Sequence, residues 1–265
     1  MKGKSLKSVA GKVADFMWAV GSILGFLAIW QLLVMVTPLG RLLPSPLQVT
    51  GMLFRSVKTP IGPLTIQMHA FYSLKRIMVG YSVAVVSGIT IGIGMGLSRT
   101  FRAIFRPLFE LIRPIPTVAW IPLAILWFGV DEMSKYFIVF YGAFANVVLS
   151  VYDGIQSVDP VLVGAARMLG CTERQIIYKV VLPSCVPYIF SGMQVALSAG
   201  ICSVVVAEMI KSTEGVGWII HAGQQVANMT QVLTGMAGMS LFGVLLAAVL
   251  TMIERKACAW NTRDI

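Results

Sequence analysis

The strongest constraint on this chain is a series of apolar runs, several of them near the length that crosses a lipid bilayer. They lie at about 16–37, 77–97, 115–130, 136–152, 188–207 and 236–253, with short charged stretches between them. A spanning helix needs about 20 apolar residues. Only 12% of the side chains are charged, against about 25% in soluble domains. We therefore expect an all-α membrane protein with six transmembrane helices.

The basic residues predict how these helices are oriented. The chain has 21 Lys and Arg against 11 Asp and Glu, an excess that in a soluble protein suggests nucleic acid. In a membrane protein such an excess instead indicates which segments face the cytoplasm, because cytoplasmic loops are rich in Lys and Arg. With the N-terminus inside, 13 of the 21 fall in cytoplasmic segments and seven in outer ones. We expect a multi-pass membrane protein with both termini cytoplasmic, surrounded by lipid and binding no nucleic acid.

The first run is too long for a cleaved signal peptide, whose apolar region has about 7 to 15 residues. In the second run, Gly88, Gly92 and Gly96 recur every four residues. One face of that helix is therefore nearly bare, and another backbone can approach it closely. The close neighbour is either a helix of the same subunit or a second copy of the chain.

The third region carries four prolines, which disfavour one straight helix: Pro107, Pro114, Pro116 and Pro122. A broken helix at membrane depth is tolerated where it is buried in protein or lines a water-filled cavity. Glu110 and Arg113 stand three residues apart, and they either pair with each other or anchor in the headgroup region. These two residues and Trp120 are candidates for a pathway or gate.

The segment 153–183 has helix signals in place of linker composition. Asp159 before Pro160 predicts a helix start, and Gly170 predicts its end. Thr172 and Gln175 form a capping box, with Glu173 between them, for a second helix that Pro183 is expected to end. Both helices have an apolar face. They are either a docking element for another protein or helices that lie on the membrane surface.

These residues carry a resemblance to a known family. The pattern Ala165-Ala166-x-x-x-Gly170, nine residues, then Val180-x-Leu182-Pro183 is similar to the EAA signature of permease subunits of binding-protein-dependent ABC importers. Gly164 stands where that signature has glutamate. Three further stretches resemble the nitrate, sulfonate and taurine branch of these permeases: 113–129, 151–160 and 207–217.

The resemblance implies the type I ABC importer permease fold and a location in the bacterial inner membrane. It divides the chain into a cytoplasmic tail (1–15), a first helix and external segment (16–63), the permease domain (64–255) with coupling helices at 159–182, and a second cytoplasmic tail (256–265). The implied partners are two ATPase subunits, an external binding protein and a second permease, for which we favour a homodimer. The implied cargo is a small anion such as a sulfonate, taurine or nitrate.

The ATPase subunits would then be coupled through a set of residues in the EAA loop: Asp159, Ala165, Ala166, Gly170, Thr172, Glu173, Arg174, Leu182 and Pro183. A charged residue at Ala165 or Ala166 is expected to uncouple ATP hydrolysis from uptake. Glu208 and Lys211, near the outer end of the fifth run, are candidates either for a gate lining or for a salt bridge on the outer side.

No stretch of the sequence matches GxxxxGK[ST], the loop that cradles nucleotide phosphates. We therefore expect a non-catalytic subunit that binds no cofactor, with ATP and Mg²⁺ in the partner ATPase. His69 and His221 have no cluster of other ligands around them in the sequence, so no metal site is predicted. The competing interpretations are a membrane-embedded enzyme and a self-contained secondary transporter or channel.

Overall fold

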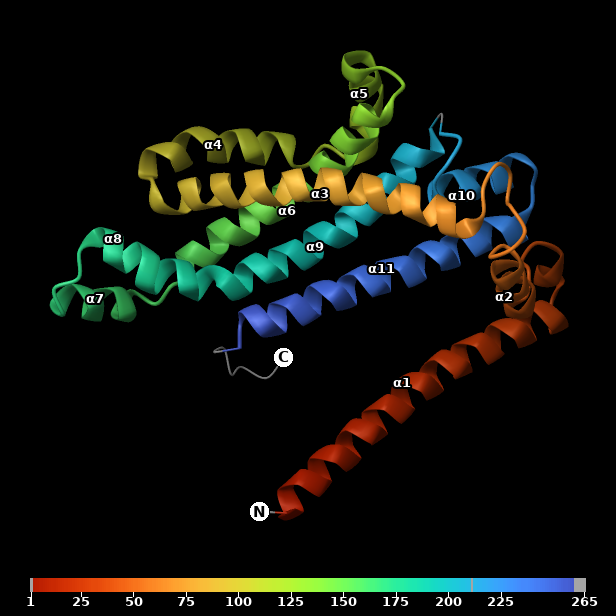
Figure 1. The fold of residues 1–265 in the computed structure, drawn as a ribbon, viewed down its shortest axis with the longest axis horizontal. Coiled ribbons are helices and arrows are strands. Elements are labelled where there is room, and N and C mark those ends of the chain that lie inside the picture. Colours follow the sequence, from red (N-terminus) through yellow and green to blue (C-terminus); the bar gives the residue numbers. More distant parts are fainter. Residues whose placement is uncertain (1, 211, 260–265) are drawn as a thin grey trace.

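The computed structural model describes residues 2–210 and 212–259, and these form helices without any strand (Figure 1). One isolated antiparallel bridge joins Ile61 and Leu64. The elements in chain order are α1 (Lys2–Val36), a 3₁₀ turn η1 (Pro38–Arg41), α2 (Pro46–Arg55), α3 (Ile66–Leu97), α4 (Arg99–Ile112), a 3₁₀ turn η2 (Thr117–Trp120), α5 (Ile121–Phe128), α6 (Glu132–Gln156), α7 (Pro160–Met168), α8 (Glu173–Ile176), a π-helical turn η3 (Ile177–Val181), α9 (Leu182–Met209), α10 (Val216–Gln225) and α11 (Met229–Ala257).

Helices α3, α6 and α9 form the centre of the molecule, which we call the three-helix unit. Four glycines of α3 each face the side chain 59 residues further on in α6: Gly80 with Val139, Gly88 with Val147, Gly92 with Val151 and Gly96 with Ile155. The constant offset shows that α3 and α6 run parallel, side by side. The bare glycine face is therefore used for packing within one subunit, the first of the two interpretations.

Helix α9 packs against both α3 and α6, and it runs in the opposite direction to α6. Gly142 of α6 faces Ser203 near the end of α9, and Gly192 near the start of α9 faces Ser150. Glycines therefore allow close contact along most of the α3–α6 pair and most of the α6–α9 pair. The main hydrophobic core is built from the side chains between these three helices.

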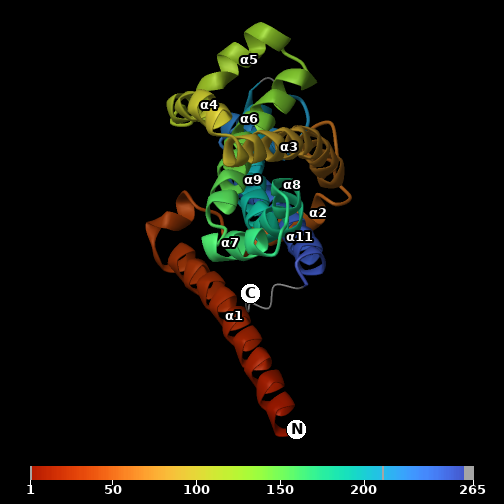
Figure 2. The ribbon, with the colours of Figure 1, turned by 90° about the vertical axis from the view of Figure 1, so that its left-hand side faces the viewer.

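The proline-rich region forms a broken span. Helices α4 and α5 are bent by 94° across the break between them, and Figure 2 shows α5 standing away from α3 and α9. Because α3 and α6 run parallel, α4 and α5 together must return the chain from the end of α3 to the start of α6. The six predicted spans are therefore five continuous helices and one broken one, and the predicted interruption is confirmed.

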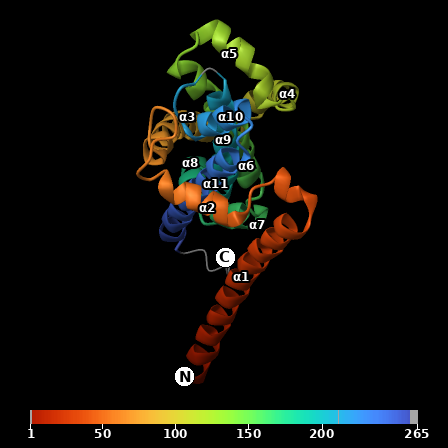
Figure 3. The same ribbon diagram turned by 90° about the vertical axis from the view of Figure 1, so that its right-hand side faces the viewer.

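The remaining helices lie around this unit. Helices α7 and α8 lie at one end, the α7/α8 end, and α2 and α10 lie at the opposite end, the α10 end (Figure 1). Helix α1 projects away from the rest in both side views (Figures 2 and 3), and none of residues 17–36 is buried. This helix begins at Lys2, inside the segment that we expected to be a tail.

Pro183 does not end the second coupling helix, so that prediction is wrong. Instead, α8 continues through η3 directly into α9, with Pro183 in the first turn of α9. A proline inside a regular α-helix removes a hydrogen bond and clashes with the carbonyl four residues earlier. The π-helical turn lengthens the hydrogen-bond spacing to five residues just before the proline, and the helix continues.

Candidate docking and translocation sites

The first coupling helix, α7, starts and ends as predicted. The Asp159 carboxylate accepts a hydrogen bond from the backbone N–H of Val161 at 2.8 Å. Gly170, with φ of 80°, turns the chain at the other end. Four apolar side chains project from α7 and the residue after it, and we call them the α7 face: Val161 (73% exposed), Leu162 (52%), Met168 (85%) and Leu169 (84%).

The second coupling helix presents its apolar face inward. The capping box of Thr172 and Gln175 is present, as predicted, but Ile176 and Val181 are buried in the main core. Ala166 of α7 is buried there too, while Ala165 is half-buried. The larger apolar surface open to a partner is therefore the α7 face, whereas the second helix exposes Tyr178 (70%) and turns most of its apolar face inward, which corrects the expectation that both helices offer one.

The polar residues of this loop lie on its surface. Glu173 accepts hydrogen bonds from Arg167 Nε at 2.9 Å and Nη2 at 3.3 Å. This carboxylate raises the pKa of Arg167 and ties α7 to α8 across Gly170. Arg174 is exposed, whereas Leu182 and Pro183 are half-buried at the start of α9.

The broken span borders two adjacent cavities. The larger one, of about 640 Å³, lies between α4, η2 and α6 and is mostly apolar, with Trp120 and Tyr141 in its wall. The second, of about 340 Å³, lies towards the α7/α8 end and is lined by charged side chains of Arg106, Glu110, Arg113 and Asp153 among others. Both cavities share Phe109, Arg113 and Asn146.

The three predicted pathway residues of this region therefore line cavities, but not in the predicted pairing. Glu110 accepts a hydrogen bond from Arg106 Nε at 2.8 Å, one turn earlier in α4, and not from Arg113. Arg113 caps the end of α4, where the chain turns away, and it forms no ion pair within residues 2–210 and 212–259. The ring centroids of Trp120 and Tyr141 are 4.7 Å apart.

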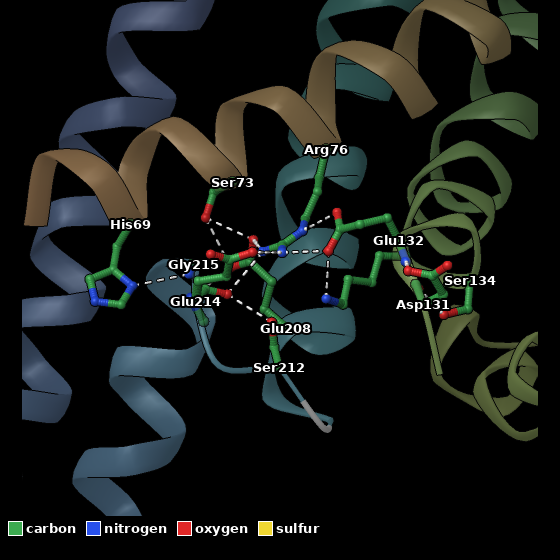
Figure 4. Close-up of polar contacts among 12 residues, drawn as sticks. His69, Ser73, Arg76, Asp131, Glu132, Ser134, Glu208, Ser212, Glu214 and Gly215 are labelled. Atoms are coloured by element: carbon green, nitrogen blue, oxygen red, sulfur yellow. Dashed lines mark hydrogen bonds and ion pairs between the residues drawn. The ribbon is translucent and has the colours of Figure 1, made fainter. Parts of the chain in front are cut away.

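Glu208 does not line either cavity. It is fully buried, and its carboxylate accepts a hydrogen bond from Arg76 Nη1 at 2.9 Å (Figure 4). The salt bridge that we considered for this residue exists, with Arg76 of α3 as the partner. Lys211, the partner named from the sequence, lies outside the described residues. The sequence contained one signal for this contact, namely that Arg76 stands at the edge of an apolar run. A charge in a membrane span needs a partner.

The side chains around these two cavities can bind a small solute and release it again. Arg113 places a guanidinium, which is charged at every physiological pH and carries five N–H donors, at the junction of the two cavities. Within the described residues, no group of three or more His, Cys, Asp or Glu side chains is arranged to hold a metal ion. The arrangement suits transient contact with a small anion.

Comparison with known proteins identifies the family. The profile of the binding-protein-dependent transport system inner membrane component matches residues 88–257. The taurine transport system permease protein TauC of Escherichia coli (strain K12) is 35% identical over 248 residues, which cover 92% of this chain and 89% of TauC. The putative aliphatic sulfonates transport permease protein SsuC of Bacillus subtilis (strain 168) is 34% identical over 193 residues, 73% of this chain and 70% of SsuC.

Solved structures show the same fold. A chain of the MetNI methionine ABC transporter, in an inward-facing conformation, superposes with a TM-score of 0.62 at 18% identity, covering 71% of this chain and 94% of that one. The sequence matches establish the family, and the structural match establishes the fold. This chain belongs to the inner-membrane permease subunits of binding-protein-dependent ABC importers, in the nitrate, sulfonate and taurine branch, and has their type I fold.

Proposed function

We propose that this permease forms half of a translocation pathway for a small organic or inorganic anion, and that the anion passes Arg113. The observation that carries this proposal is the position of Arg113, in the wall of both cavities beside the broken span. The larger cavity has room for a small solute, and the second lies beside it on the side towards the α7/α8 end. A solute in transit would therefore meet this guanidinium.

The chemistry of the relatives' cargo supports an anion. Taurine and aliphatic sulfonates, named for TauC and SsuC, both carry a sulfonate group. A guanidinium binds tetrahedral oxyanions through paired N–H donors. The proposed substrate class for this chain is accordingly a sulfonate, taurine, nitrate or a similar small acid.

The α7 face supplies the proposed connection to an energy source. Four apolar side chains exposed to water at the end of the bundle favour burial against another protein. We assign this face to an ATPase subunit, which would bind ATP and Mg²⁺. The complete importer would contain two such ATPases, two copies of this permease and an external binding protein at the α10 end, with both termini of the permease in the cytoplasm.

The anion proposal is tested by uptake of labelled taurine, alkyl sulfonates and nitrate in cells that express the importer. Arg113→Gln should lower uptake of the transported anion by about tenfold or more, because a charge-assisted hydrogen bond is lost. Arg113→Lys should retain part of the activity. Arg99→Gln removes a positive charge from the start of the same helix, outside both cavities, and serves as the matched control.

Equal uptake by the Arg113→Gln variant and the wild type, at equal membrane levels, contradicts a role for Arg113 in the pathway. Co-purification separates the importer from its rivals. A membrane-embedded enzyme or a self-contained transporter would act without an ATPase, whereas the importer requires one that is retained through detergent extraction.

A further inference from the structure

Arg76 is fully buried at the α10 end and lies at the centre of an ion cluster (Figure 4). Its Nε and Nη2 atoms donate to the two carboxylate oxygens of Glu132, at the start of α6, at 2.9 and 2.7 Å. Its Nη1 atom donates to Glu208, near the end of α9, at 2.9 Å, and to the backbone carbonyl of Glu214 at the same distance. One side chain of α3 therefore holds α6, α9 and the segment before α10.

A second layer of hydrogen bonds fixes the start of α10. The Glu208 carboxylate also accepts from Ser73 Oγ at 2.8 Å and from the backbone N–H of Gly217 at 2.9 Å. Ser73 Oγ in turn accepts from the N–H of Val216 at 2.9 Å. The first turn of α10 is thus bound to α3 and α9 through a carboxylate that is itself held by Arg76. A buried charge persists only when such partners satisfy it.

The cluster and the coupling loop lie at opposite ends of the three-helix unit (Figure 1). At the α7/α8 end, the loop from α7 through η3 connects α6 directly to α9. Between the two ends, the glycine contacts hold α3 to α6 and α6 to α9 along their length. Packed interiors of this kind move as units because they resist continuous deformation.

We propose that Arg76 is a positioning residue that fastens α10 to the three-helix unit and, within that unit, fastens the start of α6 and the end of α9 to α3. A displacement of α7 would then move the outer surface by the same rigid motion, and a binding protein docked at the α10 end would in turn influence the ATPases. This inference rests on the proposed function, because it assumes both partners. Arg76 itself touches neither of them and neither cavity.

The test uses the complete importer, reconstituted in lipid vesicles, with two readouts: basal ATP hydrolysis and its stimulation by the loaded binding protein. Arg76→Met alone leaves the buried Glu208 carboxylate without a cation beside it and is at risk of not folding. The double variant Arg76→Met/Glu208→Gln removes one charge of each sign, and the glutamine amide still accepts hydrogen bonds. Basal hydrolysis should persist, while stimulation should fall by about tenfold, within the 5- to 150-fold range typical of coupling between distant sites. Lys58→Gln, an exposed charge at the same end, is the control.

A distance measurement tests the rigid unit directly. Spin labels at Lys179→Cys and Gln225→Cys, both exposed and outside the α7 face, mark η3, which packs on α7, and the end of α10 in one copy of an otherwise cysteine-free complex. In the wild-type background their separation should stay the same with and without a nonhydrolysable ATP analogue. In the double variant the distance distribution should broaden or shift.

The results separate this inference from the proposed function. Normal stimulation in a double variant that assembles at wild-type levels overturns the role of Arg76, as does a wild-type separation of the spin labels that changes with nucleotide. If instead the wild-type complex retains no ATPase, or its hydrolysis does not respond to a binding protein, the proposed function fails and the inference fails with it.

Discussion

At Gly92 the absence of a side chain decides how closely α3 approaches α6. A Cβ atom at this position would lie 2.7 Å from Val151 Cβ and 2.8 Å from the Val148 carbonyl oxygen. Since two continuous helices must separate to accept it, Gly92→Ala should destabilise the permease by about 1–3 kcal/mol, the usual cost of overpacking. The measurement is the thermal unfolding midpoint of the detergent-solubilised permease.

The same substitution at Gly164 is the matched control. A Cβ atom there has no atom within 4 Å, so Gly164→Ala should stabilise α7 by up to about 1 kcal/mol through helix propensity alone. Equal shifts of the midpoint in the two variants would contradict the close packing of α3 on α6.

Single residues also show which features the sequence could and could not predict. The glycine face of α3 was readable because its repeat of four lies within one helix. The partners of Arg76 were not, because Glu132 and Glu208 lie 56 and 132 residues away in the chain. Their proximity depends on α3 and α6 running parallel, which is a property of the whole bundle. Arg76 lies just before the run predicted at 77–97 and was counted with the outer basic residues, so no partner was predicted for it.

Among the helices, α7 is the element whose exposed apolar surface has the clearest proposed partner. Val161→Glu places a charge on the α7 face, in the first turn of the helix, where a carboxylate suits the helix dipole. The helix itself should therefore persist. Burial of the unpaired charge in an interface should lower the amount of co-purified ATPase by about tenfold or more, and coupled uptake should fall with it.

Val226→Glu is the control for this prediction, because Val226 is 70% exposed at the opposite end of the molecule. Retention of the ATPase by both variants would place the docking surface elsewhere. Of the two alanines at which a charge was expected to uncouple hydrolysis from uptake, Ala166 is a poorer site for this test than Val161. Ala166 is buried, and a charge there would damage the core.

Elements defined by local signals were predicted well. The start of α7 at Asp159 and the capping box at Thr172 depend on residues within one turn, and both are present. The continuation of the chain through Pro183 was missed, because a π-helical turn has no clear local signature. The pairing of Glu110 with Arg106 was also missed, although an i, i+4 spacing within one helix is a local signal, because only the nearer Arg113 was considered as its partner.

On the scale of the whole molecule, the parallel course of α3 and α6 fixes the topology. The proposed cytoplasmic position of both termini requires an even number of spans, and five continuous helices with one broken helix supply six. The α7/α8 end and the α10 end must then face opposite sides. Which end faces the cytoplasm follows from the distribution of basic residues, and it is open to direct measurement.

The measurement is labelling with a membrane-impermeant thiol reagent in a cysteine-free background. Gln175→Cys, exposed in α8, should react only after the cells are permeabilised, because the coupling loop must face ATP. Thr59→Cys, exposed between α2 and α3, should react in intact spheroplasts. Each variant is the control for the other, since both side chains are exposed in short polar segments. If Gln175→Cys reacted in intact spheroplasts, the α7 face would lie on the side without ATP, and its assignment to an ATPase would be wrong.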